Sequence, residues 1–184
     1  MDSATNTDST PRSLVVMGVA GCGKSSLGQA VAHALGWTLL EGDDFHAPES
    51  VAKMRAGVAL DDSDREGWLD RLGEQLRGHP EGVVLTCSAL RQRYRDRLRA
   101  ASPGLRFAFL DLDQATAFQR VASRPGHLFP PSLVASQFAT LEPPLAEPGV
   151  LRVDARLPLE RLCAEVVDWL AAGGTTAAVP VPQP

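Results

Sequence analysis

The chain has 184 residues, of which 44% are hydrophobic, and it carries a formal net charge of −4 with a pI near 5.5. This length suits a single domain that buries about 70% of the surface of its unfolded chain. The negative charge argues against nucleic acid as the main partner, because no net positive field attracts a phosphate backbone. No apolar run approaches the roughly 18 residues of a membrane span, so we expect no membrane partner.

Both ends of the chain are poor in apolar surface. Residues 1–12 are rich in Ser, Thr and Asp, and residues 173–184 end in a Pro-rich run. Such segments bury too little surface to fold, so we predict two disordered tails around a single domain at residues 13–172.

Three cysteines, Cys22, Cys87 and Cys163, have no metal-ligand spacing, and no signal peptide precedes them. We therefore expect free thiols in a reducing cytoplasm. Cys22 is interpreted as a small residue tolerated within a loop, with a redox switch as the alternative.

The first elements of the domain are a strand at residues 14–17 and a helix at residues 26–35, joined by residues 18–25. This joining segment has the G-x-x-x-x-G-K-[ST] pattern of a P-loop. Glycines let consecutive N–H groups curl around phosphate oxygens, and the positive end of the helix dipole faces the same anion. The residues predicted to bind nucleotide phosphates are Gly18, Val19, Ala20, Gly21, Cys22, Gly23, Lys24, Ser25 and Ser26.

Two residues of this loop have a predicted chemical role. Lys24 would reach the β- and γ-phosphates, and the Ser25 hydroxyl would be a ligand of Mg²⁺. The competing interpretation is a Gly-rich turn with an incidental lysine.

Residues 37–40 predict a second strand, which is followed by Glu41, Asp43, Asp44 and His46. Acidic and imidazole groups at the carboxyl end of such a strand lie where open α/β sheets bind ligands. This segment is the second candidate site. The alternative is an acidic turn that leads into a helix.

Two helices are predicted next, one at residues 48–56 and one that begins near residue 63. Ser63 and Glu66 fit a capping box for the second helix. Its core-facing side chains would be Trp68, Leu69, Leu72 and Leu76. Arg65 is either a surface charge or a neutralising partner for the neighbouring aspartates.

A third strand is predicted at residues 83–85, followed by a helix with five arginines. Arg91, Arg95 and Arg99 would share one face of that helix and Arg93 and Arg97 another, so they form no single stripe for nucleic acid. We expect most of them to lie in solvent. Arg91 and Arg95 are nearest the carboxyl end of the strand and are placed to face an anionic ligand.

A fourth strand at residues 107–110 precedes a helix capped by Asp113 that runs to residue 122 or 123. A basic, hinge-bearing stretch with Arg120, Arg124 and His127 follows. We predict a mobile lid over about residues 120–137, whose arginines cover a triphosphate. The alternative is a surface loop with stray charge.

The chain closes with a helix at residues 133–141, a strand at 150–153 and an amphipathic helix at 159–170. Five strands alternating with helices predict a parallel sheet with right-handed crossovers. We therefore predict a three-layer α/β sandwich with a five-stranded parallel sheet.

A P-loop alone does not separate switches, motors and kinases. Several further motifs stand in the chain: Gly42-Asp43 with His46, Lys53-Met54, Asp64-Arg65 with Trp68-Leu69, Cys87-Ser88-Ala89-Leu90 with Tyr94-Arg95, Gly126-His127, and Gln137-Phe138 with Thr140-Leu141-Glu142. Together with the P-loop they resemble the small gluconokinase family over about residues 14–170. The chain departs from the family pattern at Glu41, where Asp is common, and at Ala47 and Ser50.

The resemblance implies a cytoplasmic, usually dimeric P-loop kinase whose fold is related to nucleoside monophosphate and shikimate kinases. It would use ATP and Mg²⁺ to phosphorylate the 6-hydroxyl of D-gluconate, a small-molecule sugar acid, giving 6-phosphogluconate. Catalytic roles are implied for Lys24, Asp43 and Arg124, with Arg120 and Arg124 in the lid. The acceptor-binding residues implied are Asp43, His46, Lys53, Arg65, Ser88, Arg91, Arg95 and His127, with acceptor-binding helices over about residues 46–78.

The residues taken alone agree with phosphoryl transfer, which needs charge cancellation and alignment more than covalent help. Asp43 is the best-placed carboxylate to orient an acceptor hydroxyl and take its proton. Two alternatives stay open: a kinase for another small acceptor, such as shikimate or a nucleoside monophosphate, and a non-catalytic nucleotide switch. A switch would need a base-specificity motif such as N-K-x-D, which the sequence lacks.

Overall fold

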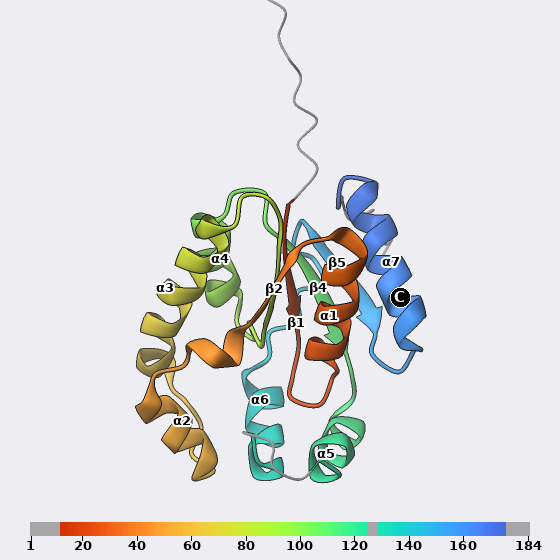
Figure 1. Cartoon of the computed structure of the whole chain (residues 1–184). Helices are drawn as coiled ribbons and strands as arrows, with labels where there is room; N and C mark the ends of the chain where they lie inside the picture. The colour runs from red at the N-terminus through yellow and green to blue at the C-terminus, as the bar shows by residue number, and fades with distance from the viewer. Residues whose placement is uncertain (1–11, 125–128, 176–184) are drawn as a thin grey trace, which may run out of the picture.

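Five parallel strands form one sheet with the order β2-β3-β1-β4-β5 (Figure 1). The structure is a computed structural model and describes residues 12–124 and 129–175. The strands are β1 (Ser13–Met17), β2 (Thr38–Glu41), β3 (Val83–Cys87), β4 (Arg106–Asp111) and β5 (Val150–Asp154). The predicted five-stranded parallel sheet is thus confirmed, and each strand begins and ends within about two residues of its expected bounds.

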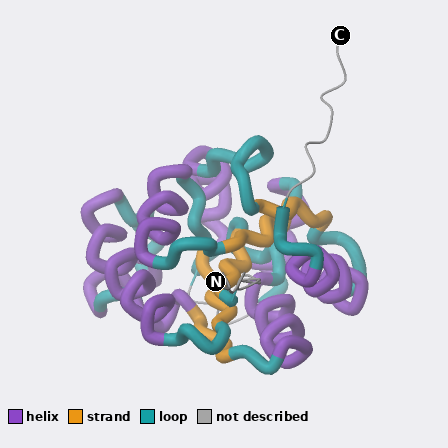
Figure 2. The backbone as a smooth tube through the Cα atoms, turned by 90° about the horizontal axis from the view of Figure 1, so that it is seen from above, coloured by secondary structure: helices purple, strands orange, loops and turns teal. Residues whose placement is uncertain are grey.

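Helices cover both faces of this sheet (Figures 1 and 2). The main helices are α1 (Lys24–Leu35), α2 (Pro48–Arg55), α3 (Asp62–Gly78), α4 (Gln92–Ala101), α5 (Gln114–Ala122), α6 (Val134–Thr140) and α7 (Leu159–Ala171). Short 3-10 helices η1 (Gly42–Phe45) and η2 (Pro131–Leu133) lie between them. Helices α1 and α7 pack side by side on one face of the sheet, and α3 and α4 pack on the other, which makes the predicted three layers.

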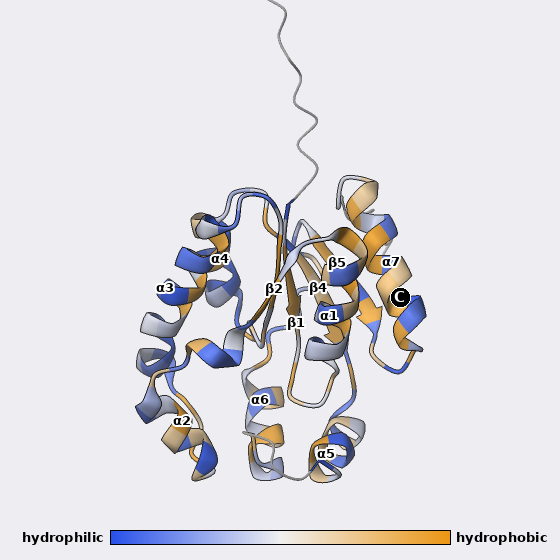
Figure 3. Ribbon diagram, viewed as in Figure 1, coloured by the Kyte–Doolittle hydropathy of each residue, from blue (hydrophilic) through white to orange (hydrophobic). Residues whose placement is uncertain are grey.

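The core has two halves because side chains of a strand alternate between the two faces of a sheet. All five residues of β1 are buried, as expected for a central parallel strand. Leu14 and Val16 belong to the half beneath α1 and α7, whereas Val15 and Met17 belong to the half beneath α3 and α4. Figure 3 shows the hydrophobic colour along β1 and the hydrophilic colour on the outer side of α3.

The start of α3 differs from the prediction. Asp61, not Ser63, is the N-cap: its carboxylate accepts the backbone N–H of Asp64 at 3.0 Å, and the Asp64 carboxylate accepts the N–H of Asp61 at 3.0 Å. Ser63 only donates to the Asp61 side chain, at 2.7 Å. The predicted Ser63–Glu66 capping box is therefore wrong, because an equally good cap stands two residues earlier. The Asp113 cap of α5 is confirmed, with Thr116 N at 2.9 Å.

The carboxyl ends of the strands all point to the same end of the sheet, which is the lower end in Figure 1, where η1, α2, α5 and α6 gather. Within the described residues, no helix has both the length and the apolar content needed to cross a membrane.

Candidate active site

A pocket opens at the carboxyl ends of β1, β2 and β3. Its wall is made of the loop before α1, the η1 segment, the start of α3, Ser88 after β3, and α6. The predicted site residues that line it are Ala20, Gly21, Gly23, Lys24, Ser25, Ser26, Asp43, His46, Arg65, Ser88 and Arg124. The fold therefore brings the two candidate sites, which lie apart in the sequence, to one pocket.

The P-loop keeps its shape through close backbone packing. Gly18 has a φ of +147°, and a Cβ there would lie 2.9 Å from the backbone oxygen of Leu110, so only glycine fits. Gly23 is the N-cap of α1 and makes no side-chain hydrogen bond to the first turn. The first-turn N–H groups at this helix end are the donors that a phosphate uses.

The ammonium of Lys24 curls back over this loop. Its Nζ donates to the backbone oxygens of Gly18 at 3.1 Å and Val19 at 3.0 Å. Lys24 also lines the pocket, so its charge lies next to the loop that would hold phosphates.

Cys22 is buried behind the loop, together with Gly18 and Val19, and does not line the pocket. Burial raises the pKa of the Cys22 thiol above its ordinary value, although Lys24 and Arg120 pull it the other way. A thiol with a raised pKa is a poor redox sensor, which favours the interpretation of Cys22 as a small packing residue.

An oxygen-rich corner lies between the P-loop and the ends of β2 and β3. Glu41 Oε2 accepts hydrogen bonds from Ser25 Oγ at 3.0 Å and from Thr86 Oγ1 at 2.5 Å. Mg²⁺ prefers oxygen ligands, and in proteins it is usually held by one or two carboxylates while water and phosphate oxygens complete its coordination. This corner offers one carboxylate and hydroxyl oxygens beside the phosphate site. The residues at this corner therefore fit Mg²⁺.

The η1 segment is fixed by a tight backbone contact. A Cβ on Gly42 would lie 2.3 Å from the backbone oxygen of Thr86, so glycine is needed for η1 to approach β3. The Gly42 oxygen accepts the indole N–H of Trp68 at 2.7 Å. Asp43, the next residue, is thereby held at the pocket with its side chain 62% exposed.

His46 lies under Asp43 with its ring mostly buried. Its Nε2 is 3.8 Å from Asp43 Oδ1, and its Nδ1 has no hydrogen-bond partner among the described residues. Burial lowers the pKa of His46 below its ordinary value; the Asp43 carboxylate raises it, and Arg65 and Arg71 lower it further. The imidazole is therefore neutral at neutral pH.

Four further basic residues in the described part of the chain were expected at the acceptor, Lys53, Arg65, Arg91 and Arg95, and only Arg65 lines the pocket. Lys53 instead pairs with Asp64, with its Nζ 2.6 Å from Oδ1, and Arg91 lies 3.9 Å from the carboxylate of Asp62.

Arg95, also expected to face the acceptor, is buried and outside the pocket. It is paired with Glu147, so the structure gives this guanidinium an internal carboxylate partner instead of a ligand.

Of the two arginines predicted in the lid, one lines the pocket and the other does not. Arg124 lines the pocket, whereas Arg120 lies behind the P-loop and donates to the backbone oxygens of Gly21 at 3.5 Å and Ala155 at 3.1 Å. His127 lies outside the described residues.

Comparisons with known proteins give a matching domain model and several similar relatives. A family model described as an AAA domain matches residues 14–144. The gluconokinase of Gluconobacter oxydans is 45% identical over 148 residues, which cover 78% of this chain and 82% of the relative. The thermoresistant gluconokinase of Escherichia coli is 37% identical over 163 residues, or 86% of this chain and 93% of the relative. The chain belongs to the gluconokinase family.

Solved structures are similar to this chain in their three-dimensional fold as well. A gluconokinase from Sinorhizobium meliloti superposes with a TM-score of 0.81 at 44% identity, covering 89% of this chain and 93% of that one. A deoxyadenosine kinase from M. mycoides superposes with a TM-score of 0.60 at 14% identity over 86% of this chain and 99% of that one, which shows a shared fold alone.

Two residues that bond to the P-loop were given no individual role from the sequence: Glu41, which lies in the acidic segment after β2 and outside the pocket lining, and Gln137, which lines the pocket. Glu41 carries a local signal, an acid at the carboxyl end of a strand beside a P-loop. Gln137 on α6 accepts the backbone N–H of Ala20 with its Oε1 at 2.6 Å, across 117 residues of sequence. No local pattern predicts that contact.

Proposed function

We propose that the chain is an ATP-dependent gluconate kinase, which transfers the γ-phosphoryl group of ATP to the 6-hydroxyl of D-gluconate and releases 6-phospho-D-gluconate and ADP. The observation that carries this proposal is the shared pocket. Lys24 and Ser25 of the P-loop stand on one side of it, and Asp43, Arg65 and Ser88 stand on the other. A phosphate donor and a small polar acceptor can therefore meet in this pocket. The family of the chain makes gluconate the acceptor.

The nucleotide half is assigned to the P-loop. Its backbone N–H groups from Gly18 to Ser26 would hold the phosphates, and Lys24 and Arg124 would balance charge on the transferred group. Arg120 would support the loop from behind, through the carbonyl of Gly21. Ser25 and Glu41 would hold Mg²⁺, which supplies further charge neutralisation at the phosphates.

The acceptor half is assigned to Asp43 and its neighbours. Asp43 would orient the 6-hydroxyl and take its proton, while the hydroxyl oxygen bonds to the γ-phosphorus and the bond from that phosphorus to the bridging oxygen breaks, leaving ADP. Arg65 would grip the gluconate carboxylate, since a guanidinium pairs with a carboxylate bidentately. His46 and Ser88 would bond to hydroxyls, with Lys53, Arg91 and His127 as outer contributors.

The assembly and location are proposed on the resemblance. The family pattern supports a homodimer in the cytoplasm. The three free cysteines agree with a reducing compartment. The net charge of −4 supports a small-molecule partner over nucleic acid. Light scattering at several protein concentrations tests the dimer.

The test of function is an ADP-release assay with Mg²⁺-ATP and, in turn, gluconate, glucose, shikimate and AMP. We expect the highest kcat/KM for gluconate. Glucose lacks the carboxylate that Arg65 would pair with, so its kcat/KM should be lower by about 10⁴-fold. A kcat/KM for glucose, shikimate or AMP equal to that for gluconate would overturn the assigned substrate.

A further inference from the structure

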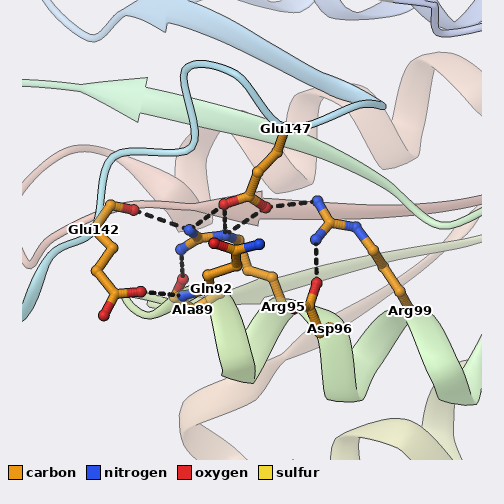
Figure 4. Close-up of polar contacts among 7 residues, drawn as sticks. All are labelled: Ala89, Gln92, Arg95, Asp96, Arg99, Glu142 and Glu147. Carbon is orange, nitrogen blue, oxygen red and sulfur yellow. Dashed lines mark hydrogen bonds and ion pairs between the residues drawn. The ribbon is translucent and has the colours of Figure 1, made fainter.

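Arg95 joins three separate segments of the chain at a place away from the pocket (Figure 4). Its side chain is 1% exposed. Nε donates to both carboxylate oxygens of Glu147 at 3.1 and 3.0 Å, and Nη2 also donates to that carboxylate. Nη1 donates to the backbone oxygen of Ala89 at 2.7 Å, and Nη2 to that of Glu142 at 2.9 Å. A single guanidinium therefore holds two carbonyls in addition to its counter-ion.

Glu147 is the charge that keeps Arg95 in place. Its carboxylate is 12% exposed and also accepts Arg99 Nη2 at 2.8 Å. Burial raises the pKa of Glu147, but the hydrogen bonds from Arg95 and Arg99 outweigh that effect and hold the pKa below its ordinary value. The pair is therefore ionised, and its geometry is bidentate, the arrangement that fixes orientation best.

On one side, Arg95 holds a strained turn next to the pocket. Ala89 has a φ of +45° and is the only non-glycine residue with positive φ in the described part of the chain. A residue with a Cβ adopts this conformation only when its surroundings enforce it. Ala89 directly follows Ser88, which lines the pocket, so the hydrogen bond to the Ala89 carbonyl bears on where Ser88 points.

On the other side, Arg95 holds the segment that leaves α6. The N–H of Glu142 donates to the Leu90 carbonyl at 2.8 Å, and the Glu142 side chain accepts the N–H of Gln92 at 2.7 Å. Five residues before Glu142, Gln137 lines the pocket and accepts a hydrogen bond from the backbone N–H of Ala20 in the P-loop. The segment held by Arg95 thus runs from the wall beside Ser88 to the P-loop.

We propose that Arg95 is a positioning residue for the acceptor site: it sets Ser88 and the end of α6 through the carbonyls of Ala89 and Glu142, and it does not contact the substrate. This inference rests on the proposed gluconate kinase function, and it assigns Arg95 a different part in that function from direct binding. Glu147 acts with it by fixing the guanidinium.

The experiment separates positioning from simple stabilisation. Arg95→Met leaves the mostly buried Glu147 carboxylate with Arg99 as its remaining ion-pair partner and should lower Tm. Arg95→Met/Glu147→Leu removes both charges, and because no uncompensated charge is then left in the interior, its Tm should lie above that of Arg95→Met. The two carbonyls still lack their donor, so we expect KM for gluconate to stay raised about tenfold or more while KM for ATP changes less than about threefold.

Two further variants complete the set. Arg95→Lys keeps a charge for Glu147 but lacks the fork that reaches both carbonyls, so the same shift in KM is expected even if the double variant does not fold. Arg97 lies on the same helix as Arg95 and forms an exposed ion pair with Asp70 of α3. Arg97→Met removes this pair and should leave Tm and both KM values unchanged.

A double variant or Arg95→Lys with wild-type KM for gluconate would overturn the proposal. Hydrogen exchange of residues 88–92, Leu141 and Glu142 without ligands provides a readout that does not depend on the substrate: we expect faster exchange in both variants than in wild type. Wild-type protein that fails to phosphorylate gluconate would contradict the proposed function alone, whereas unchanged exchange would contradict the positioning role alone.

Discussion

The indole of Trp68 lies flat against the imidazole of His46, with ring centroids 4.5 Å apart and an angle of 11° between the ring planes. The same indole donates its N–H to the carbonyl of Gly42 at 2.7 Å. One core side chain of α3 therefore fixes both ends of the segment that carries Asp43. Trp68 is 1% exposed, so this segment of the pocket wall is packed directly on the core.

Trp68→Phe should destabilise the fold by about 1–3 kcal/mol, because it leaves the buried carbonyl of Gly42 without its donor. Urea unfolding measures the loss. Trp169→Phe is the matched control, since Trp169 Nε1 has no hydrogen-bond partner within the described residues. We expect a smaller loss there. Equal losses in the two variants would show that the Trp68 hydrogen bond contributes nothing beyond packing.

His46 should titrate below pH 6.5, its ordinary pKa, and should do so at a still lower pH in Asp43→Asn, because the Asp43 carboxylate is the group that raises its pKa. Heteronuclear NMR of the four histidines follows this directly. A pKa of His46 that rises in Asp43→Asn would contradict the geometry of the pair.

The same shift has a consequence for stability. Because the folded pKa of His46 is the lower one, the unfolded chain binds the proton more readily, and the stabilising contribution is complete above pH 6.5. It is lost as the pH falls from there through the folded value. The free energy of unfolding should therefore fall less between pH 7.5 and pH 5.5 in His46→Gln than in wild type.

Asp43→Asn should reduce turnover by about 10²- to 10⁴-fold while ATP affinity stays nearly constant, because the amide keeps the shape but cannot take a proton. Steady-state kinetics and nucleotide titration measure the two quantities. Asp44→Asn, at the exposed neighbouring position outside the pocket, should leave both unchanged. Collapse of ATP binding in Asp43→Asn would instead indicate that Asp43 supports the metal.

Lys24→Ala should reduce turnover by about a hundredfold or more, which is typical for loss of one preorganised charge. Its effect on stability should be about 1 kcal/mol, since only two hydrogen bonds to loop carbonyls are lost. Turnover and thermal melting are measured on the same preparation. Near-normal turnover would show that the loop glycines alone suffice.

The sequence predicted the sheet and the P-loop because both depend on short-range patterns. The apolar run at residues 14–17 and the glycine spacing at 18–25 need no information from elsewhere in the chain. The cap of α3 was misassigned because residues 61–64 contain four possible caps in a row, and the local pattern does not rank them.

The partners of the site residues could not be predicted in this way. Helix periodicity places Arg95 beside Arg91 and Arg99. It does not predict that Glu147, 52 residues after Arg95, pairs with Arg95 and Arg99. The contact between Glu41 and Thr86 spans 45 residues, and it forms only because β2 and β3 are neighbours in the sheet. Local patterns thus predict which side chains reach the pocket edge, whereas strand order decides what they meet there.

The chain contains two lysines, Lys24 and Lys53, and every other basic side chain apart from histidine is an arginine. Lys24 lines the pocket, and Lys53 lies next to the pocket residue Met54. Apart from the amino terminus, amine-directed acylation will therefore modify this protein only at or beside its pocket. Attaching the protein to a sensor through Lys24 will cover the pocket, whereas protection of Lys24 from acylation offers a label-based measure of how much of the pocket is occupied.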